Sequence, residues 1–474
     1  MPGTRRSAPD VGDGAPAGGA ASRQRVKGCV YYAIQVPKGG PGKTSTGHAL
    51  AHAFAHRGLN VLVVDADQQR DLTNAFFGNI IQKDYDYQYA DFLARSGPSP
   101  RSLYESLLPL TRPGNQPTPH PVPLQALART PGKNGSIHVI CGHKNTNSLG
   151  IKIGTAWNLA ATDQTKMELP GAPFAMIERA AKSVDADVVL LDLHPDLSPL
   201  NCMLVMSSDY FFSPVEADSP SLEAMWNLKD RIMLGDGGAA PEDRPWSEVY
   251  QEWVAMTHDA INGRGKFSNG PLDLRGHHVR DVRAKFMGII INKFMVNKKD
   301  ATFAQGVCCD LPAQPVQIWM SKQLKDVYKI ASDYQDGGDV AGGYAVGQEL
   351  YDKRLSGQKH QDYLLRILGR VPHFGALNAL SHEQRLPASY VAAADSNNKN
   401  RSLYFRRIYD HVAYNILHLT YLDNPSLLNH QQPKDLTKNE PRLGGPPSGK
   451  FTLIKQDEMD NLRCDLAKEK HWPK

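Results

Sequence analysis

A glycine-rich loop near the amino end constrains the fold more than any other feature of the chain. Residues 38–45 read K-G-G-P-G-K-T-S, after an apolar run at residues 29–34 and before a helix-like run at residues 48–55. Glycines let successive backbone N–H groups face one anion, and a helix that begins near Lys43 adds the positive end of its dipole. The order of strand, glycine loop and helix therefore predicts a βα unit whose loop binds phosphate.

The residue types in this loop suit a nucleoside triphosphate. Lys43 can reach the β- and γ-phosphates, and Thr44 can ligate magnesium through its hydroxyl. Pro37 occupies the first glycine position of the P-loop pattern G-x-x-x-x-G-K-[ST]. We expect nucleotide contacts along the whole loop, from Gly39, Gly40, Pro41, Gly42, Lys43, Thr44 and Ser45.

An additional lysine, Lys38, opens the loop. The form K-G-G-x-G-K-[ST] resembles the deviant Walker A motif of the ParA/MinD family of ATPases. In that family the first lysine reaches across a dimer interface to the ATP of the partner subunit. The resemblance therefore implies ATP and Mg²⁺ as cofactors, catalytic roles for Lys38 and Lys43, and a homodimer that sandwiches ATP between its subunits.

The second strand-like run also fits this family. Residues 59–69 look like its second strand and its D-x-D-P-Q motif, with Gln68 at the usual proline position. The resemblance implies that Asp67 orients the attacking water and that Asp65 belongs to the magnesium shell. The alternative is that both carboxylates merely cap a turn at the end of a strand.

A third run, at residues 188–195, is almost continuously apolar until Asp192. Such runs are typical of central parallel strands, and an acidic residue at the carboxyl end lies where ligands bind. The run resembles a Walker B strand, which makes Asp192 a magnesium ligand. His194 stands at a common proline position, and we favour a local variation there over a catalytic base.

Later runs resemble the base-binding side of the same family. Residues 286–292 end in Asn292, the position whose amide hydrogen-bonds the adenine edge in the family. Residues 366–372 end in Pro372, which resembles the proline turn beside the base. Between these and the third run, residues 209–215 read as a strand, followed by a helix with Ser219 as N-cap and Pro220 at its first position.

These segments predict an α/β fold: a doubly wound, mostly parallel sheet flanked by helices, of the P-loop NTPase type with long insertions. We expect one enlarged ATPase domain at residues 27–425, because the chain has one set of nucleotide motifs. Around and within it we expect a disordered tail at 1–26, insertions near 75–135, 233–282 and 295–360, and a carboxyl-terminal extension at 426–474.

Composition limits the partners and the compartment. The 54 basic and 49 acidic residues permit contact with nucleic acid without requiring it. No apolar run approaches the roughly 20 residues that span a bilayer, and the tail lacks the apolar region of a signal peptide. The six cysteines lack metal-type spacing, which also disfavours a nitrogenase-type iron protein. We therefore expect a cytoplasmic protein with reduced cysteines, open to association with the nucleoid.

Two clusters of side chains have competing interpretations. In ParA-like proteins, basic residues late in the fold bind DNA phosphates without reading sequence, so Arg401, Arg406 and Arg407 are candidates for DNA binding. The alternative is a solvated helix face. The glycine-loop helix carries a stripe of histidines at i, i+4 and i+8, for which a helix surface is favoured over a metal site: His48, His52 and His56.

The resemblance implies a ParA-like ATPase, a dimerisation switch that hydrolyses ATP slowly to partition or position DNA or a large cargo. Non-specific duplex DNA and an activating or cargo-adaptor protein are the implied partners. One alternative is the ATPase subunit of another machine, such as a defence or conjugation complex. Another is an amidoligase-like biosynthetic enzyme on the same fold, which would not need Lys38.

Overall fold

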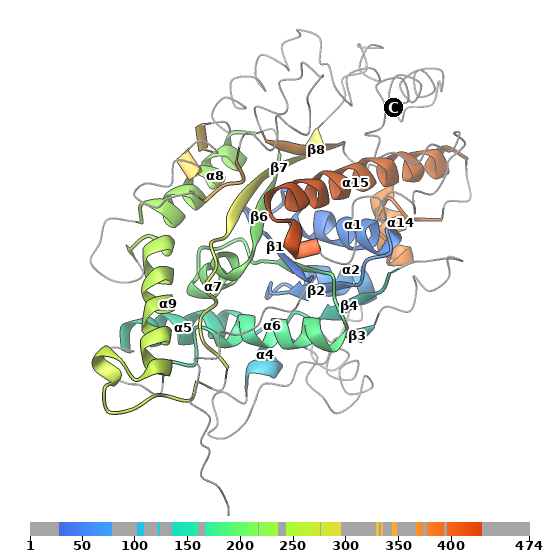
Figure 1. Cartoon of the computed structure of the whole chain (residues 1–474). Helices are drawn as coiled ribbons and strands as arrows, with labels where there is room; N and C mark the ends of the chain where they lie inside the picture. Colours follow the sequence, from blue (N-terminus) through green and yellow to red (C-terminus); the bar gives the residue numbers. More distant parts are fainter. Residues whose placement is uncertain are drawn as a thin grey trace, which may run out of the picture.

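One eight-stranded sheet forms the centre of the part of the chain that the computed structural model describes (Figure 1). The described residues are 28–77, 102–108, 122–123, 135–159, 166–216, 218–235, 243–274, 276–294, 329–330, 333–334, 344–347, 366–372, 377–392 and 396–428. The tail at 1–26, most of the first and third insertions and most of the carboxyl-terminal extension therefore lie outside the described residues.

The strand order is β3-β4-β2-β5-β1-β6-β7-β8. Seven strands are parallel, and β3 pairs antiparallel with β4 at one edge. The strands are β1 (Val30–Ile34), β2 (Val61–Asp65), β3 (Val122–Pro123), β4 (Ile137–Ile140), β5 (Val188–Asp192), β6 (Tyr210–Glu216), β7 (Lys285–Phe294) and β8 (Ile367–Pro372). The predicted doubly wound parallel sheet is confirmed, and β4 is a strand that the sequence analysis missed.

Helices cover both faces of the sheet (Figure 1). The helices are α1 (Lys43–His56), α2 (Asp71–Phe77), α4 (Leu103–Leu107), α5 (Asn147–Leu159), α6 (Ala172–Ser183), α7 (Pro199–Ser207), α8 (Ser219–Met233), α9 (Trp246–Asn262), α14 (Leu377–Gln384) and α15 (Ser396–Asp423), with short 3-10 turns at Gly265–Phe267 and Pro425–Leu428. None of those in the described ranges is both long and apolar enough to cross a bilayer.

Strand β1 shows why its apolar run predicts a central position. Val30, Tyr32 and Ile34 pack into one buried cluster with α1 and α15, while Tyr31 and Ala33 pack into another with α6 and α7. All five residues of the strand are fully buried. A strand that is covered on both faces needs apolar side chains at every position, which is what the sequence provides.

Helix α1 begins and ends at glycines, as the sequence predicts. Its N-cap Gly42 has φ 91° and Gly58, just beyond its end, has φ 86°, a conformation that L-residues rarely adopt. The N–H of Gly58 donates to the carbonyl of Ala55, which satisfies part of the last turn. The helix therefore starts directly at Lys43 and points its amino end at the loop.

One prediction about the middle of the chain differs from the structure, and one predicted insertion contains a helix that the sequence analysis did not describe. The N-cap of α8 is Asp218 and not Ser219, because the Asp218 carboxylate accepts a hydrogen bond from the N–H of Ser221 (2.8 Å). The second insertion contains α9, whose Trp246, Tyr250 and Trp253 are buried in the core. This segment is therefore in part an extension of the hydrophobic core.

Candidate functional site

The glycine loop and three strand ends meet at the carboxyl edge of the sheet. The loop follows β1, Asp65 ends β2, Asp192 ends β5, and Asn292 lies near the end of β7. Gly40 and Gly42 both have positive φ, 93° and 91°. A Cβ added to Gly42 would lie 2.8 Å from Nδ2 of Asn292, so glycine is needed there for space as well as for conformation.

Lys43 crosses the inside of the loop. Its Nζ donates to the carbonyls of Val36 (3.2 Å) and Lys38 (2.9 Å), and the residue is buried. Burial lowers the pKa of Lys43, and the negative charge of Asp192 opposes that shift. The loop carbonyls therefore hold the ammonium at the position from which it can turn to an anion in the cradle.

Asp65 and Asp192 are neighbours in the register of β2 and β5. Burial raises the pKa of Asp65 to about 7, although hydrogen bonds from Thr73 favour its charged form. Burial also raises the pKa of Asp192 well above its ordinary value, and the charge of Asp65 adds to the shift. Two adjacent buried carboxylates repel each other, which a bound cation would relieve.

The two carboxylates differ in how many of their oxygens are occupied. Asp65 accepts from the N–H (2.8 Å) and the hydroxyl (2.7 Å) of Thr73 through Oδ2, and from the N–H of Asp67 (3.1 Å) through Oδ1. Asp192 accepts from the hydroxyl of Thr44 (3.0 Å) through Oδ2, while its buried Oδ1 has no hydrogen-bond partner. Thr44 and Asp192 therefore fit the predicted Mg²⁺ better than Asp65, whose oxygens already accept hydrogen bonds from Thr73 and Asp67.

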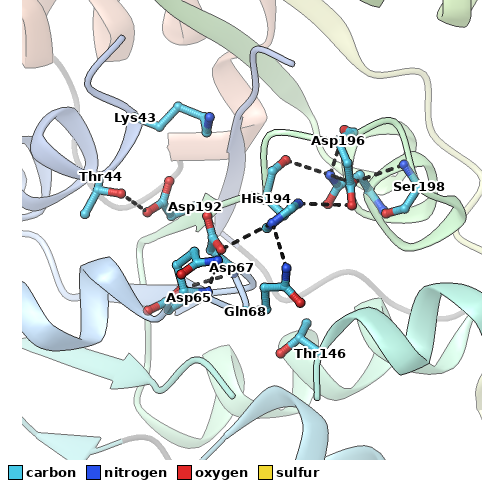
Figure 2. Close-up of polar contacts among 12 residues, drawn as sticks. Lys43, Thr44, Asp65, Asp67, Gln68, Thr146, Asp192, His194, Asp196 and Ser198 are labelled. Carbon is cyan, nitrogen blue, oxygen red and sulfur yellow. Dashed lines mark hydrogen bonds and ion pairs between the residues drawn. The ribbon is translucent and has the colours of Figure 1, made fainter. Parts of the chain in front are cut away.

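Asp67 lies beside His194 and Gln68, and Asp196 lies on the other side of the His194 ring, as Figure 2 shows. Its Oδ1 accepts from the N–H of Gln69 (2.7 Å) and lies 3.8 Å from Nε2 of His194. Contact with Asp196 raises the pKa of His194 against the opposing effect of burial. The sequence pointed to Asp67 and noted His194, but it gave no signal for their proximity to Asp196.

Lys38 is held within its own chain. Its Nζ lies 2.5 Å from Oδ2 of Asp218 and donates to the hydroxyl of Ser221 (3.0 Å). Burial alone would raise the pKa of Asp218, but the contacts with Lys38 and Ser221 lower it. The sequence analysis missed Asp218, whose signal was an N-cap residue type one position before the chosen one.

Asn292 is tied to the loop through its amide nitrogen. Nδ2 donates to the carbonyl of Pro41 (2.9 Å) and to the hydroxyl of Thr46 (3.0 Å). The amide oxygen is buried without a hydrogen-bond partner, so it is available to accept from an amino group. Pro372 ends β8, but its side chain lies outside the described residues.

A cavity of about 280 Å³ opens beside the loop. Thr44 and Ser45 line it from the first turn of α1, Asp71 from α2, and Ser381 and His382 from α14. The cavity extends the phosphate cradle toward a set of hydroxyl, carboxylate and imidazole groups. The sequence gave no signal for it, because its walls come from segments more than 300 positions apart.

The histidine stripe of α1 is not a solvated surface, and that favoured interpretation is wrong. His48 and His52 are buried, with ring centroids 4.6 Å and 5.8 Å from that of Phe76, and Tyr390 lies 5.4 Å from His52. Burial lowers the pKa of His52 to about 4 and that of His48 well below its ordinary value. No group of three metal-ligating side chains with suitable geometry occurs in the described ranges.

The candidate DNA-binding arginines lie on α15. The guanidinium of Arg406 stacks 4.2 Å from the centroid of the Tyr390 ring, and its Nε donates to the carbonyl of Ser389 (3.3 Å). Arg407 is half-buried, and the side chain of Arg401 lies outside the described residues. Arg406 thus has a packing role, and DNA contact by the three arginines stays a prediction.

One family model matches the part of the chain that contains the glycine loop and the first strand-end aspartates. Residues 31–234 match a family model described as an AAA domain, AAA_31. A comparison with curated proteins returns no match. Among solved structures, ParA of pNOB8 is similar with 14% identity and a TM-score of 0.45, over 84% of this chain and 100% of the ParA chain.

Two further structures are similar at the same level. McdA of Cyanothece has 11% identity and a TM-score of 0.42, over 82% of this chain and 99% of McdA. A protein of Corynebacterium diphtheriae has 15% identity and a TM-score of 0.48, over 83% of this chain and 100% of its own. Likeness this distant says nothing about what this chain binds. The matched residues 31–234 contain the glycine loop, Asp65, Asp67 and Asp192, so the family model and the sequence motifs together support a ParA-like P-loop fold.

Proposed function

We propose that this chain is an ATPase that binds ATP with Mg²⁺ at the carboxyl edge of its sheet and dimerises in response. The observation that carries the proposal is the buried carboxylate pair beside the loop lysine. Asp192 keeps one buried oxygen without a hydrogen-bond partner, next to the hydroxyl of Thr44. Carboxylate and hydroxyl oxygens are the ligands that Mg²⁺ prefers, and a bound cation balances the excess negative charge.

The side chains of the site divide the work of hydrolysis. Lys43 exchanges its two loop carbonyls for the β- and γ-phosphates, and Asn292 offers its free amide oxygen to the adenine amino group. When bound, Mg²⁺ neutralises charge on the β- and γ-phosphate oxygens. Asp67 orients a water whose oxygen bonds to the γ-phosphorus while the bond from that phosphorus to the ADP oxygen breaks. The proton of the water passes to Asp67 or to the departing phosphate.

Lys38 gives the switch its cross-subunit character. In the single chain its ammonium is held by Asp218 and Ser221 at the start of α8. We infer that this ammonium turns to the phosphates of the partner subunit when two ATP-bound chains meet. Phosphoryl transfer then depends on positioning and charge stabilisation, with little covalent chemistry from the protein, and we expect it to be slow, as suits a switch.

The test separates ATP binding from dimerisation. Lys43→Ala should weaken ATP binding by more than about 100-fold, because a buried charged hydrogen-bond donor is lost. Lys38→Ala should leave ATP affinity within about threefold of wild type and abolish the ATP-dependent dimer, because its charge serves the other subunit. Light scattering with ATP, ADP or no nucleotide distinguishes the monomer from the dimer. A Lys38→Ala monomer that hydrolyses ATP at the wild-type rate would refute the switch.

We propose DNA as the surface on which the dimer acts, in partitioning or positioning a large cargo. The support is the sequence of α15, which carries Arg401, Arg406 and Arg407: dimerisation doubles these cations, and each neutralised phosphate adds about −0.9 to the slope of log affinity against log salt. Arg401→Glu with Arg407→Glu should flatten that slope while ATP-dependent dimerisation is retained. The matched control is Arg244→Glu, a charge reversal beside the exposed Glu248 and Glu252 near α9. A dimer without salt-dependent DNA retention would favour a protein machine as partner.

A further inference from the structure

The loop after β5 carries a histidine between two aspartates, in the order Asp192, His194 and Asp196. Figure 2 shows that the His194 ring lies between this loop and the loop after β2. The two ring nitrogens point to opposite sides. The ring therefore links two segments that are 126 positions apart in the chain, through Gln68 and His194.

One side of the ring rests on a well-anchored carboxylate. Nδ1 of His194 lies 3.0 Å from Oδ2 of Asp196. Oδ1 of Asp196 accepts from the amide nitrogen of Asn201 (2.6 Å) and the N–H of Ser198 (3.1 Å), and its carbonyl accepts from Gln35 (2.8 Å). Asn201 also donates to the carbonyl of His194 (2.8 Å). Through Asp196 and its own carbonyl, His194 is thus linked to the first turn of α7 and to Gln35 in the segment that leads into the glycine loop.

The other side of the ring faces the residue assigned to the attacking water. Nε2 of His194 lies 3.3 Å from the amide nitrogen of Gln68 and 3.8 Å from Oδ1 of Asp67. Asp67 is buried, with 8% of its surface exposed, and its Oδ1 also accepts from the N–H of Gln69 (2.7 Å). A shift of the ring would therefore move a side chain that lies 3.8 Å from the Asp67 carboxylate (Figure 2).

We propose that His194 is a positioning residue for ATP hydrolysis, which holds the Asp67 carboxylate in the orientation that the attacking water needs. The inference rests on the proposed function, since it assigns the water to Asp67. Its physical basis is the steep dependence of such reactions on geometry: a displacement of about 1 Å can cost about 100-fold in rate. Because Asp196 belongs to the loop that follows the Walker B strand, the same ring makes the position of Asp67 depend on that loop.

Two amide substitutions separate the two sides of the ring. An asparagine at position 194 places its amide nitrogen near the position of Nδ1, so His194→Asn keeps the contact with Asp196 and loses the side that faces Asp67. A glutamine reaches the position of Nε2, so His194→Gln keeps the side that faces Asp67. His258→Asn, at an exposed position of α9, is the matched control. The readouts are kcat, KM and Kd for ATP, and the melting temperature.

We expect His194→Asn to lower kcat about 10- to 100-fold with Kd for ATP within about threefold of wild type. His194→Gln should recover most of that loss, and His258→Asn should match wild type. In an Asp67→Asn background, His194→Asn should change kcat less than about twofold, because a residue that acts through Asp67 has nothing left to position.

Other outcomes overturn the inference in different ways. Wild-type kcat in His194→Asn, or an equal loss in both backgrounds, would show that His194 does not act through Asp67. Equal loss of melting temperature and of ATP affinity in His194→Asn and His194→Gln would make the ring a structural brace. A wild-type protein that binds ATP without hydrolysing it would instead refute the proposed function, whereas a hydrolysing wild type with an unaffected His194→Asn refutes this inference alone.

Discussion

Two clusters of buried charged side chains lie at opposite ends of the strands of the same sheet, and they differ in how their positive and negative charges are paired. The amino edge is the side where the parallel strands begin, and the carboxyl edge is the side where they end. At the amino edge, Arg280 donates to the carbonyl of Ser207 (2.7 Å) and to Oδ1 of Asp209 (3.0 Å), and lies 3.6 Å from Glu178. Its guanidinium also lies 4.9 Å from the centroid of the Tyr31 ring. Although burial disfavours the charged form, Asp209 and Glu178 raise the pKa of Arg280. Each charge here has an opposite partner.

The carboxyl edge has more negative than positive charge. Asp65, Asp67 and Asp192 lie at this edge together with the buried Lys43, and burial lowers the pKa of this lysine. Burial and mutual repulsion raise the pKa of Asp192 well above its ordinary value. The amino edge is balanced in the sense that both of its carboxylates contact the guanidinium of Arg280. The unbalanced edge costs stability that a bound cation and nucleotide can return, which is typical of functional sites.

The largest expected effect lies at the balanced edge. Arg280→Met should lower the free energy of unfolding by about 3–5 kcal/mol, because Asp209 and Glu178 stay buried without their shared cation. Urea unfolding measures the loss. ATP affinity should stay within about twofold of wild type, since the site lies at the other edge of the sheet.

Arg244→Met is the control for loss of an arginine. Arg244 pairs with Glu248 and Glu252, whose side chains are more than half exposed, so its loss should cost less than about 1 kcal/mol. If Arg280→Met cost as little as Arg244→Met, the amino edge would not be a balanced buried cluster, and the contrast between the edges would fail.

Replacing an aspartate by asparagine should change the stability of the protein in opposite directions at the two edges. Asp192→Asn should raise the stability of the nucleotide-free protein at pH 8, because it removes a carboxylate whose charged form is disfavoured by burial and by the charge of Asp65, as its raised pKa indicates. The amide oxygen can still accept from Thr44. Asp209→Asn should lower stability, because it removes a partner of Arg280. Mg²⁺ should no longer strengthen ATP binding in Asp192→Asn.

The pH dependence of stability follows from the buried carboxylates of the carboxyl edge. The pKa of Asp65 is raised from 3.8 to about 7, so its folded form binds a proton more tightly than the unfolded chain. Its contribution to stability is complete below pH 4 and disappears as the pH rises through about 7, up to about 4 kcal/mol in total. Nucleotide-free wild type should therefore lose stability from pH 5 to pH 8 at this edge. A smaller loss is expected for Asp192→Asn, and an equal loss would contradict the repulsion between the strand ends.

The sequence predicted the carboxyl edge better than the rest of the molecule. Strands β2 and β5 are apolar up to the aspartate that ends each of them, so both the sheet and the meeting of Thr44 with Asp192 could be expected. Because parallel strands bring their carboxyl ends together, residues that are far apart in the sequence come to lie in one site. The glycine positions followed from the conformations that the loop requires.

What the sequence could not show depends on distant partners. His52 looks like a surface residue until Tyr390, 338 positions away, packs against it. Trp246 begins a helix inside a segment that reads as an insertion, and its burial depends on the core that surrounds it. The contact between His194 and Asp67 joins two loops whose approach is set by the register of β2 and β5.

The smallest expected effect concerns Lys38, the second cation of the carboxyl edge. Its partner Asp218 has 37% of its side-chain surface exposed, so the pair contributes little, about 0.5 kcal/mol. Asp218→Asn keeps an N-cap residue of equal quality for α8 and removes the charge that holds Lys38. We expect the ATP concentration at half-maximal dimerisation to fall roughly twofold, because the ammonium no longer has to leave a carboxylate to reach the partner subunit.

Glu223→Gln removes one charge from an exposed position of the same helix and should leave that concentration unchanged. Light scattering over an ATP titration compares the three proteins. A higher ATP requirement in Asp218→Asn would mean that Asp218 holds Lys38 in the orientation that the dimer uses. The carboxyl edge would then keep its second cation in place before the partner arrives, as the amino edge keeps Arg280.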